Sequence, residues 1–338
     1  QTLLDPHATA ELKRGTLDGW FQNILPDLNQ DDPEVARYLI QNTLWWIGRS
    51  GADGIREDTV PYVPRTFWRD WTSAIHADYP RVPVVGEVFD ADPALTSFYQ
   101  AGRAGFDGVD TGIDTVFDFP LFFAIRRTFA HHESPGELAH VIGHDELYPD
   151  AARLVTFLGN HDVPRFMSED GAAIDDLKRA LTFLFAVRGT PLVYYGDEIG
   201  MRGGADPDNR HDFPGGWAGD ARNAFTATGR TAEENAIFDH VRALAGLRKQ
   251  HPALRRGKTS DLFSSDHAYV FARTAGADRA IVVIHEGPSA EDLRIPTGGT
   301  GLADGAQLRS MRGEAVRVAA GVLEIHTEAR SAEIYVAE

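Results

Sequence analysis

The sequence predicts an α/β architecture built on parallel strands, followed by a separate all-β domain. The first observation is that apolar, strand-like runs alternate with amphipathic, helix-like segments between residues 31 and 254. The second is a change of texture from Gly257 onward, where short alternating runs are separated by Gly, Pro, Ser and Asp. Alternating strands and helices are typical of βα units with a parallel sheet, and closely spaced short strands are typical of antiparallel domains.

The helical segment that opens the α/β region has a recognisable start. Asp31 and Asp32 precede Pro33, which combines a capping acid with a first-turn proline. Apolar residues then recur at helical spacing as far as Arg49, so we expect an amphipathic helix. Its two adjacent tryptophans are interpreted as core residues rather than as a ligand platform; they are Trp45 and Trp46.

The remaining elements follow in alternation. Strands are expected at 52–58, 82–88, 115–119, 154–159 and 191–195, and helices at 64–77, 120–131, 175–188 and 233–250. Residues 1–30 are mixed and turn-rich. We therefore expect three parts, namely 1–30 as the end of an inserted domain, 31–254 as the α/β region, and 257–338 as an antiparallel β domain.

Composition narrows the functional classes. The chain has 338 residues, 43% of them hydrophobic and 25% charged, which suits a globular protein with a large core. Its 50 acidic against 33 basic residues give a formal net charge of -17, which argues against a nonspecific nucleic-acid partner. The absence of cysteine excludes thiol nucleophiles and cysteine-bound metals. No apolar run of about 18 residues predicts a membrane helix, and a bacterial periplasmic, secreted or cytoplasmic location stays open.

Acidic residues stand at the ends of three expected strands. They are Asp58 after GIRE, Glu87 in VPVVGEVF, and Asp162 in TFLGNHD. In a parallel barrel all strands end on one face, so we expect these acids to share one site. Paired carboxyl groups suit glycosidic chemistry, in which one acid protonates the leaving oxygen and another attacks the sugar carbon.

The neighbours of these acids fit that interpretation, although two alternatives remain open. Arg56 would keep Asp58 ionised, and the apolar run around Glu87 would raise its pKa as an acid catalyst requires. The alternative for Glu87 is a buried acid paired inside the barrel. The alternative for the run Asn160, His161 and Asp162 is a metal site, which the absence of HxH or HExxH spacing disfavours.

Together these runs resemble a known family. GADGIREDT at 51–59, VVGEVF at 84–89 and FLGNHDVPRF at 157–166 are similar, in order and spacing, to three of the four signature regions of the α-amylase superfamily, glycoside hydrolase family 13. LPDLN at 25–29 resembles a fifth region, and TPLVYYGDEIGM at 190–201 resembles the eighth barrel strand. Jointly the motifs are specific, whereas each one alone is weak.

The resemblance implies a role for each matching residue. Asp58 would be the nucleophile of a retaining mechanism, Glu87 the general acid and base, and Asp162 the acid that stabilises the distorted sugar. Arg56 and His161 would hydrogen-bond the nucleophile and the substrate. The further substrate contacts expected from these runs and the following loop are Asn160, Arg165, Arg210 and Trp217.

Within the superfamily the chain resembles neopullulanases and cyclomaltodextrinases. It carries Pro61 and Tyr62 where many α-amylases have Lys-His, which favours short or cyclic maltodextrins as substrates. The resemblance implies no cofactor for the chemistry and is compatible with a structural calcium ion and a homodimer. A non-catalytic binding module, and an isomerase or transglycosylase on the same scaffold, are the competing interpretations.

The expected barrel is incomplete. Five strands correspond to strands four to eight of a (β/α)8 barrel, and the family's first signature, an Asp followed by Asn-His, does not occur. We therefore expect the C-terminal part of a longer polypeptide, completed by upstream residues or a second chain. Alone, the five strands would expose unpaired edges, so residues 1–338 are not expected to form an active monomer.

Overall fold

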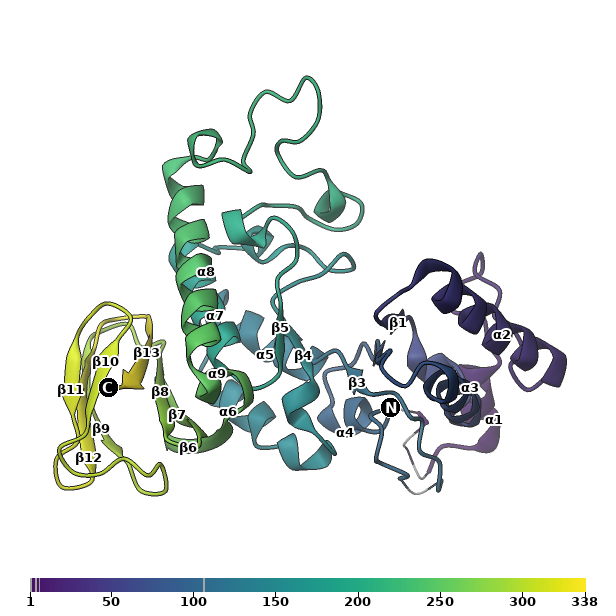
Figure 1. The fold of residues 1–338 in the computed structure, drawn as a ribbon, viewed down its shortest axis with the longest axis horizontal. Coiled ribbons are helices and arrows are strands. Elements are labelled where there is room, and N and C mark those ends of the chain that lie inside the picture. The colour runs from purple at the N-terminus through teal and green to yellow at the C-terminus, as the bar shows by residue number, and fades with distance from the viewer. Residues whose placement is uncertain (1, 4, 6, 106) are drawn as a thin grey trace. The chain divides into compact units, whose positions relative to one another are not determined.

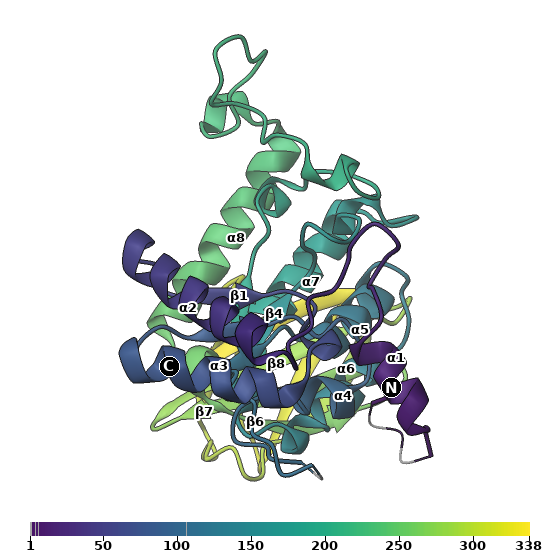
Figure 2. The same cartoon turned by 90° about the vertical axis from the view of Figure 1, so that its right-hand side faces the viewer.

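The computed structural model describes residues 2–3, 5, 7–105 and 107–338, and the chain divides into two compact units. The first unit comprises residues 1–120 and 144–155, and the second comprises 121–143 and 156–338. Figures 1 and 2 show the elements of each unit, with the C-terminal strands in yellow. Each unit has its own hydrophobic core and is described separately below.

The first unit is built around a three-stranded parallel sheet in the order β1-β2-β3. Its strands are short, and cross-strand pairing places Glu57 opposite Gly86 and Gly86 opposite Val116. The helices α2 and α3 pack against each other beside this sheet, and the indole of Trp71 donates to Thr43 Oγ1 at 3.0 Å. The elements are α1 (Ala10–Leu17), α2 (Pro33–Ser50), β1 (Ile55–Glu57), η1 (Val60–Tyr62), α3 (Arg65–Asp78), β2 (Val84–Gly86), α4 (Pro93–Ser97), β3 (Thr115–Val116), η2 (Asp145–Leu147) and η3 (Ala151–Arg153).

Helix α2 begins and ends at the residues that local chemistry favours. The carboxylate of Asp32 accepts from the amides of Glu34 and Val35 at 2.8 and 3.4 Å, and Pro33 occupies the first turn, which confirms the predicted start. Gly51 ends the helix in the left-handed conformation with φ of 69°, which glycine adopts without a Cβ clash. The chain then turns directly into β1.

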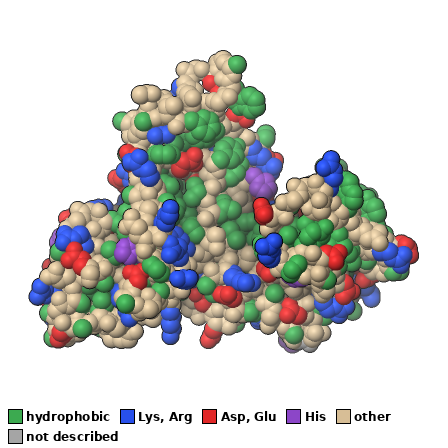
Figure 3. Space-filling view, viewed as in Figure 1, with side chains coloured by type: hydrophobic (Ala, Val, Ile, Leu, Met, Phe, Trp, Pro, Cys, Tyr) green, Lys and Arg blue, Asp and Glu red, His purple; other side chains and the backbone are tan. Residues whose placement is uncertain are grey.

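The prediction that Trp45 and Trp46 belong to the core is wrong for the described residues. Their exposed fractions are 56% and 55%, and the two rings pack edge-to-face on each other. The only residue of α2 that is fully buried is Ile47. Figure 3 shows apolar side chains gathered on the outer surface in the region of α2. The helical period was therefore correct, whereas the described part of the chain supplies no layer to cover this face.

The second unit contains a helical layer followed by a β sandwich. A six-stranded antiparallel sheet in the order β11-β10-β13-β8-β7-β6 faces the pair β12-β9, and apolar residues of both fill the space between them. Helices α7 and α8 pack together, and α7 also contacts β8 and β13. The elements are α5 (Phe119–Phe129), α6 (Gly136–Ile142), β4 (Val155–Phe157), η4 (Phe166–Ser168), α7 (Ile174–Ala186), β5 (Thr190–Leu192), η5 (Asp197–Ile199), η6 (Asp208–Arg210), η7 (Ala227–Gly229), α8 (Ala232–Gln250), α9 (Pro252–Arg256), β6 (Lys258–Ser264), β7 (Ala268–Ala275), β8 (Asp278–His285), β9 (Glu291–Pro296), β10 (Gln307–Ser310), β11 (Ala315–Arg317), β12 (Val322–Thr327) and β13 (Ser331–Ala337).

The strands of the α/β region are shorter than the sequence predicts. β1 covers three of the seven residues expected at 52–58, and β2 covers three of the seven expected at 82–88. The paired residues are Ile55–Glu57 in β1 and Val84–Gly86 in β2. A further difference is α1, which forms where only a turn-rich segment was expected.

A long connection joins η5 to α8 within the second unit. Residues 200–231 carry η6 and η7 and extend beyond the N-terminal end of α8 in both ribbon views (Figures 1 and 2). Thr231 caps α8, because its hydroxyl accepts from Glu234 N while the Glu234 carboxylate accepts from Thr231 N. The connection is thereby anchored at the start of a well-capped helix.

Candidate active site

Two acidic residues of the first unit directly follow adjacent parallel strands and occupy equivalent positions in their register. Asp58 follows β1 and Glu87 follows β2, and the register pairs Glu57 with Gly86. The ladder continues one step further, since Glu87 N donates to Glu57 O at 2.8 Å. Parallel strands end at one edge of their sheet, so this register places the two carboxyl groups side by side. We call Asp58 and Glu87 the carboxyl pair.

Arg56 bridges the carboxyl pair. It lies two residues before Asp58 and therefore on the same face of β1. One terminal nitrogen of its guanidinium pairs with Asp58 Oδ1, and the other donates to Glu87 Oε1 at 3.1 Å. A rigid, planar cation that contacts both carboxyl groups fixes their separation and orientation.

The two members of the carboxyl pair have different environments. The side chain of Asp58 is 66% exposed, whereas that of Glu87 is 8% exposed. Burial raises the pKa of Glu87, and the proximity of Asp58 adds to the rise, while the amide of Thr59 and Arg56 oppose it. Glu87 is thus suited to hold a proton, and Asp58 is accessible to an approaching reactant.

The backbone amide of Thr59 binds the Glu87 carboxyl group, and the backbone of Thr59 is strained. Its φ and ψ are 48° and 36°, a left-handed conformation that is rare for a β-branched residue. In this conformation Thr59 N donates to Glu87 Oε2 at 3.0 Å. Strain of this kind costs on the order of 1–3 kcal/mol and is concentrated at functional sites. No residue pattern in the sequence signals it, and Thr59 was not among the predicted site residues.

Glu57, the strand neighbour of Asp58, differs from it in surroundings. Burial raises the pKa of Glu57 to about 7, with a smaller contribution from Asp58 in the same direction and an opposing one from Arg56. Successive side chains on a strand point to opposite faces, so Glu57 does not share the face of Arg56 and Asp58. Glu57 is therefore the strand neighbour of Asp58 and not a member of the carboxyl pair.

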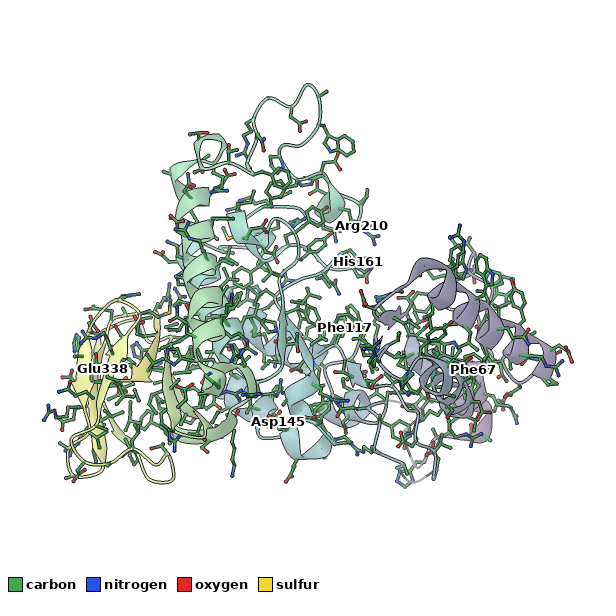
Figure 4. All side chains as sticks on the ribbon, in the orientation of Figure 1. Phe67, Phe117, Asp145, His161, Arg210 and Glu338 are labelled. Carbon is green, nitrogen blue, oxygen red and sulfur yellow. The ribbon has the colours of Figure 1, made fainter. Side chains whose placement is uncertain are left out.

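The third predicted acid lies in the second unit, on the loop after β4. Asp162 N donates to Asn160 Oδ1 at 2.8 Å, which closes a tight turn around His161. The carboxylate of Asp162 is held from two sides, by His161 Nε2 at 3.2 Å and by Arg210 Nη2 at 3.2 Å. Figure 4 shows His161 and Arg210 close to each other at the tips of two loops. Asn160, His161 and Arg210 therefore gather around Asp162.

Arg165 is placed differently from the predicted sugar contact. Its side chain is buried, and its guanidinium donates to Tyr195 O at 2.7 Å and to Asn209 O at 3.1 Å. An ion pair with Asp197 at 3.3 Å completes this environment, and burial raises the pKa of Asp197 to about 7. The rings of Tyr194 and Tyr195 lie 4.5 and 4.7 Å from the guanidinium carbon. The structure thus gives Arg165 a structural role in place of direct substrate contact.

The remaining predicted contact is an aromatic residue on the connection before α8. Trp217 is 70% exposed, and its amide donates to Asp220 Oδ2 at 2.9 Å. An exposed indole on a glycine-rich loop offers a flat apolar surface with one polar edge. Its role as a stacking platform stays a prediction.

Two kinds of feature do not occur in the part of the chain that the structure describes. In residues 2–3, 5, 7–105 and 107–338, no group of three or more His, Asp or Glu side chains is placed to hold a metal ion. None of the described helices combines the length and the apolar composition needed to cross a membrane.

Comparisons with known proteins place these observations in context. A family model described as "Alpha amylase, catalytic domain" matches residues 18–257. The chain is 32% identical over 268 residues to the "Beta/alpha-amylase" of Paenibacillus polymyxa, which covers 77% of this chain and 20% of that relative. It is also 32% identical over 279 residues to a cyclomaltodextrinase of Geobacillus thermopakistaniensis, which covers 80% of this chain and 43% of that relative.

A solved structure shows the same likeness. The crystal structure of an Anoxybacillus alpha-amylase superposes with a TM-score of 0.81 at 30% identity, over 96% of this chain and 67% of that one. The chain spans less than half the length of the two curated relatives named above.

Proposed function

The chain belongs to the α-amylase family, and we propose that it is the catalytic C-terminal part of a retaining glycosidase that cleaves α-1,4 links in cyclic or linear maltodextrins. One observation carries this proposal, namely the carboxyl pair bridged by Arg56, with Glu87 buried and Asp58 exposed. Adjacent carboxyl groups with opposite environments are what double displacement requires. The cyclomaltodextrinase relative, with 32% identity, supports the substrate class.

The mechanism follows from these environments. The protonated carboxyl of Glu87 gives its proton to the glycosidic oxygen as the bond to the anomeric carbon breaks. Asp58 attacks that carbon through a carboxylate oxygen and forms a covalent glycosyl ester. Glu87, now ionised, then takes a proton from water, whose oxygen displaces Asp58 with net retention of configuration. Arg56 keeps both carboxyl groups in position throughout.

Residues of the second unit are assigned to stabilising the reacting sugar rather than to proton transfer or nucleophilic attack. Asp162 would stabilise the distorted sugar ring, with His161 and Asn160 as hydrogen-bonding neighbours. Arg210, whose guanidinium pairs with Asp162, is assigned to the same sugar unit, and the exposed Trp217 on the connection before α8 is assigned to a more distant one. Pro61 and Tyr62, which follow Asp58, support a preference for short or cyclic chains.

We further propose that an upstream polypeptide completes the barrel, so that β1 to β5 correspond to strands four to eight. In the described sheet β1 pairs only with β2 and leaves its other edge open. Trp45 and Trp46 expose apolar surface on α2. The relatives are also longer, since this chain covers 43% of the cyclomaltodextrinase. A soluble, cooperatively unfolding and active product from residues 1–338 alone would refute this part of the proposal.

The test of function uses the complete polypeptide, including any residues encoded upstream of Gln1. Products from cyclodextrin, pullulan and starch are measured for the wild type and for Asp58→Asn and Glu87→Gln. We expect glucose and short maltodextrins from the wild type and a loss of about a thousandfold or more in both variants. Wild-type binding without turnover would favour a non-catalytic binding module, and an isomerised or transferred product would favour an isomerase or a transglycosylase. Full activity in both variants would overturn the assignment.

A further inference from the structure

Asn209 is a fully buried amide that joins two loops of the second unit. It lies in η6 and is 0% exposed. Its Nδ2 donates to His161 O and to Val163 O, both at 2.9 Å. These two carbonyl groups stand on either side of Asp162 in the chain. A single side chain thus holds the backbone both before and after the proposed third acid.

The backbone of Asn209 is fixed in turn by Arg165. Arg165 Nε donates to Asn209 O at 3.1 Å, and Arg165 N donates to Gly203 O at 2.9 Å. The guanidinium is itself held by Tyr195 O and by Asp197. A Cβ at position 203 would lie 2.7 Å from Asn209 Cα, so the two loops meet at a distance that only glycine permits.

This arrangement sets the position of Arg210, the residue that follows Asn209. Arg210 Nη2 reaches Asp162 Oδ1 at 3.2 Å, and Arg210 Nε reaches Asp206 Oδ1 at 2.6 Å. Both partners of the ion pair between Arg210 and Asp162 therefore belong to segments that Asn209 ties together. If the tie were lost, the two segments could move apart without breaking any strand ladder.

We propose that Asn209 and Arg165 act as positioning residues that hold Asp162 and Arg210 in the geometry required for glycosidic bond cleavage, a role that rests on the proposed function. We call these two residues the loop latch. Neither is assigned a contact with the sugar. The chemistry explains the residue type at 209, because an amide nitrogen donates two hydrogen bonds at once. An aspartate of the same shape would place an acceptor against two carbonyl groups, and an alanine would leave both carbonyl groups unpaired.

The chain offers a matched control for Asn209. Asn235 of α8 also uses Nδ2 to hold two backbone carbonyl groups, donating to Ala227 O at 2.9 Å and to Arg230 O at 3.4 Å. It lies in the same unit and closes a loop in the same way. None of its partners belongs to the segments that carry Asp162 and Arg210. Asn235→Asp is therefore expected to lower stability without a specific effect on turnover.

The first experiment compares kcat and KM of Asn209→Asp, Arg165→Lys and Asn235→Asp in the complete polypeptide, with maltotriose and a cyclodextrin as substrates. For Asn209→Asp we expect kcat to fall by about 10²-fold, since small misplacements of reacting groups cost that much. KM is expected to change by less than about threefold. Arg165→Lys should show a smaller fall in kcat, because lysine keeps the charge but has one donor nitrogen where arginine uses Nε and Nη1. An unchanged kcat for folded Asn209→Asp would overturn the proposal.

A second measurement is independent of activity. Hydrogen exchange of the amides in segments 160–165 and 203–211 is compared between the wild type, Asn209→Asp and Asn235→Asp. We expect faster exchange in both segments for Asn209→Asp and no change there for Asn235→Asp. Unchanged exchange in Asn209→Asp would contradict the loop latch even if the wild type cleaves no glucan, and an inactive wild type would by itself contradict only the proposed function.

Discussion

The carboxyl pair of the first unit and Asp162 of the second are held in place by different means. Asp58 and Glu87 follow two strands whose ladder sets their register, and the ladder bond from Glu87 N to Glu57 O continues to the site itself. Asp162 lies on a loop, where side-chain bonds from Asn160 and Asn209 fix the backbone. The first arrangement depends on the backbone bonds of a short strand ladder, and the second depends on a few named side chains.

This difference determines which substitutions should displace the carboxyl pair and which should displace Asp162. In the first unit the backbone would keep its course after most side-chain changes, so only groups that touch the carboxyl pair should matter. In the second unit a single buried amide carries two hydrogen bonds, each worth about 1 kcal/mol net and more when a buried partner is left unpaired.

The largest expected effect after loss of an acid is that of Arg56→Met. Removing the guanidinium takes away a cation that contacts both members of the carboxyl pair and leaves Glu87 held by the amide of Thr59. We expect kcat to fall by about 10²-fold. Arg56 lowers the pKa of Glu87, so its loss should raise that pKa further. Because the reaction needs protonated Glu87, the alkaline limb of the pH profile of kcat should move to higher pH. A limb that moves to lower pH would contradict the assigned role of Glu87.

Glu57→Gln tests whether ionisation of the acid next to the proposed nucleophile lowers the stability of the folded protein. The pKa of Glu57 is raised to about 7 by burial, so the folded state binds a proton that the unfolded state releases above its ordinary pKa of 4.5. Wild-type stability therefore decreases as pH rises from about 4.5 to 7, and the variant lacks this loss. Above pH 7 we expect Glu57→Gln to be more stable by roughly 1–3 kcal/mol.

The measurement for Glu57 is the free energy of unfolding at pH 4.5 and pH 8 for both proteins. The variant should resemble the wild type at the lower pH and exceed it at the higher pH. An equal difference at both pH values would show that the ionisation of Glu57 is not the cause.

Thr59→Gly separates backbone strain from hydrogen bonding. Glycine adopts the left-handed conformation at φ of 48° without a Cβ clash. Relief of strain and the greater entropy of the unfolded chain oppose each other, so we expect a net gain in stability of about 1 kcal/mol or less. kcat should fall a fewfold, because the amide that binds Glu87 becomes less fixed. A large loss of stability in thermal unfolding would contradict the strained assignment.

The smallest expected effect is that of Trp217→Ala in the second unit. The indole is 70% exposed, so its removal should leave thermal stability unchanged within about 0.5 kcal/mol. If it stacks on sugar, KM for long maltodextrins should rise severalfold while KM for maltotriose stays the same. A KM for long maltodextrins that is the same in Trp217→Ala as in the wild type would exclude Trp217 as a substrate contact.

Sequence reasoning found the features whose signal is local. Asp32 and Pro33 mark the start of α2 because capping depends on neighbouring residues, and Glu87 stands out because an acid is rare in an apolar run. Thr59 was missed because its left-handed backbone angle cannot be inferred from the residue type. Asn209 was missed because its partner His161 lies 48 positions away in the chain. Arg165 was assigned to a sugar contact because the sequence does not show that it is buried. Its burial depends on contacts with Tyr195 and Asp197, which lie far away in the chain.

The most direct test of the proposed mechanism is to trap the covalent intermediate with an activated fluorinated glucosyl substrate and to locate the label by mass spectrometry of peptides. We predict a single label on Asp58, with none on the adjacent Glu57 and none on Glu87. Retention of configuration in the first product should accompany it. A label on Glu57, or an inverted product without any label, would contradict the proposal that Asp58 and Glu87 act as nucleophile and acid.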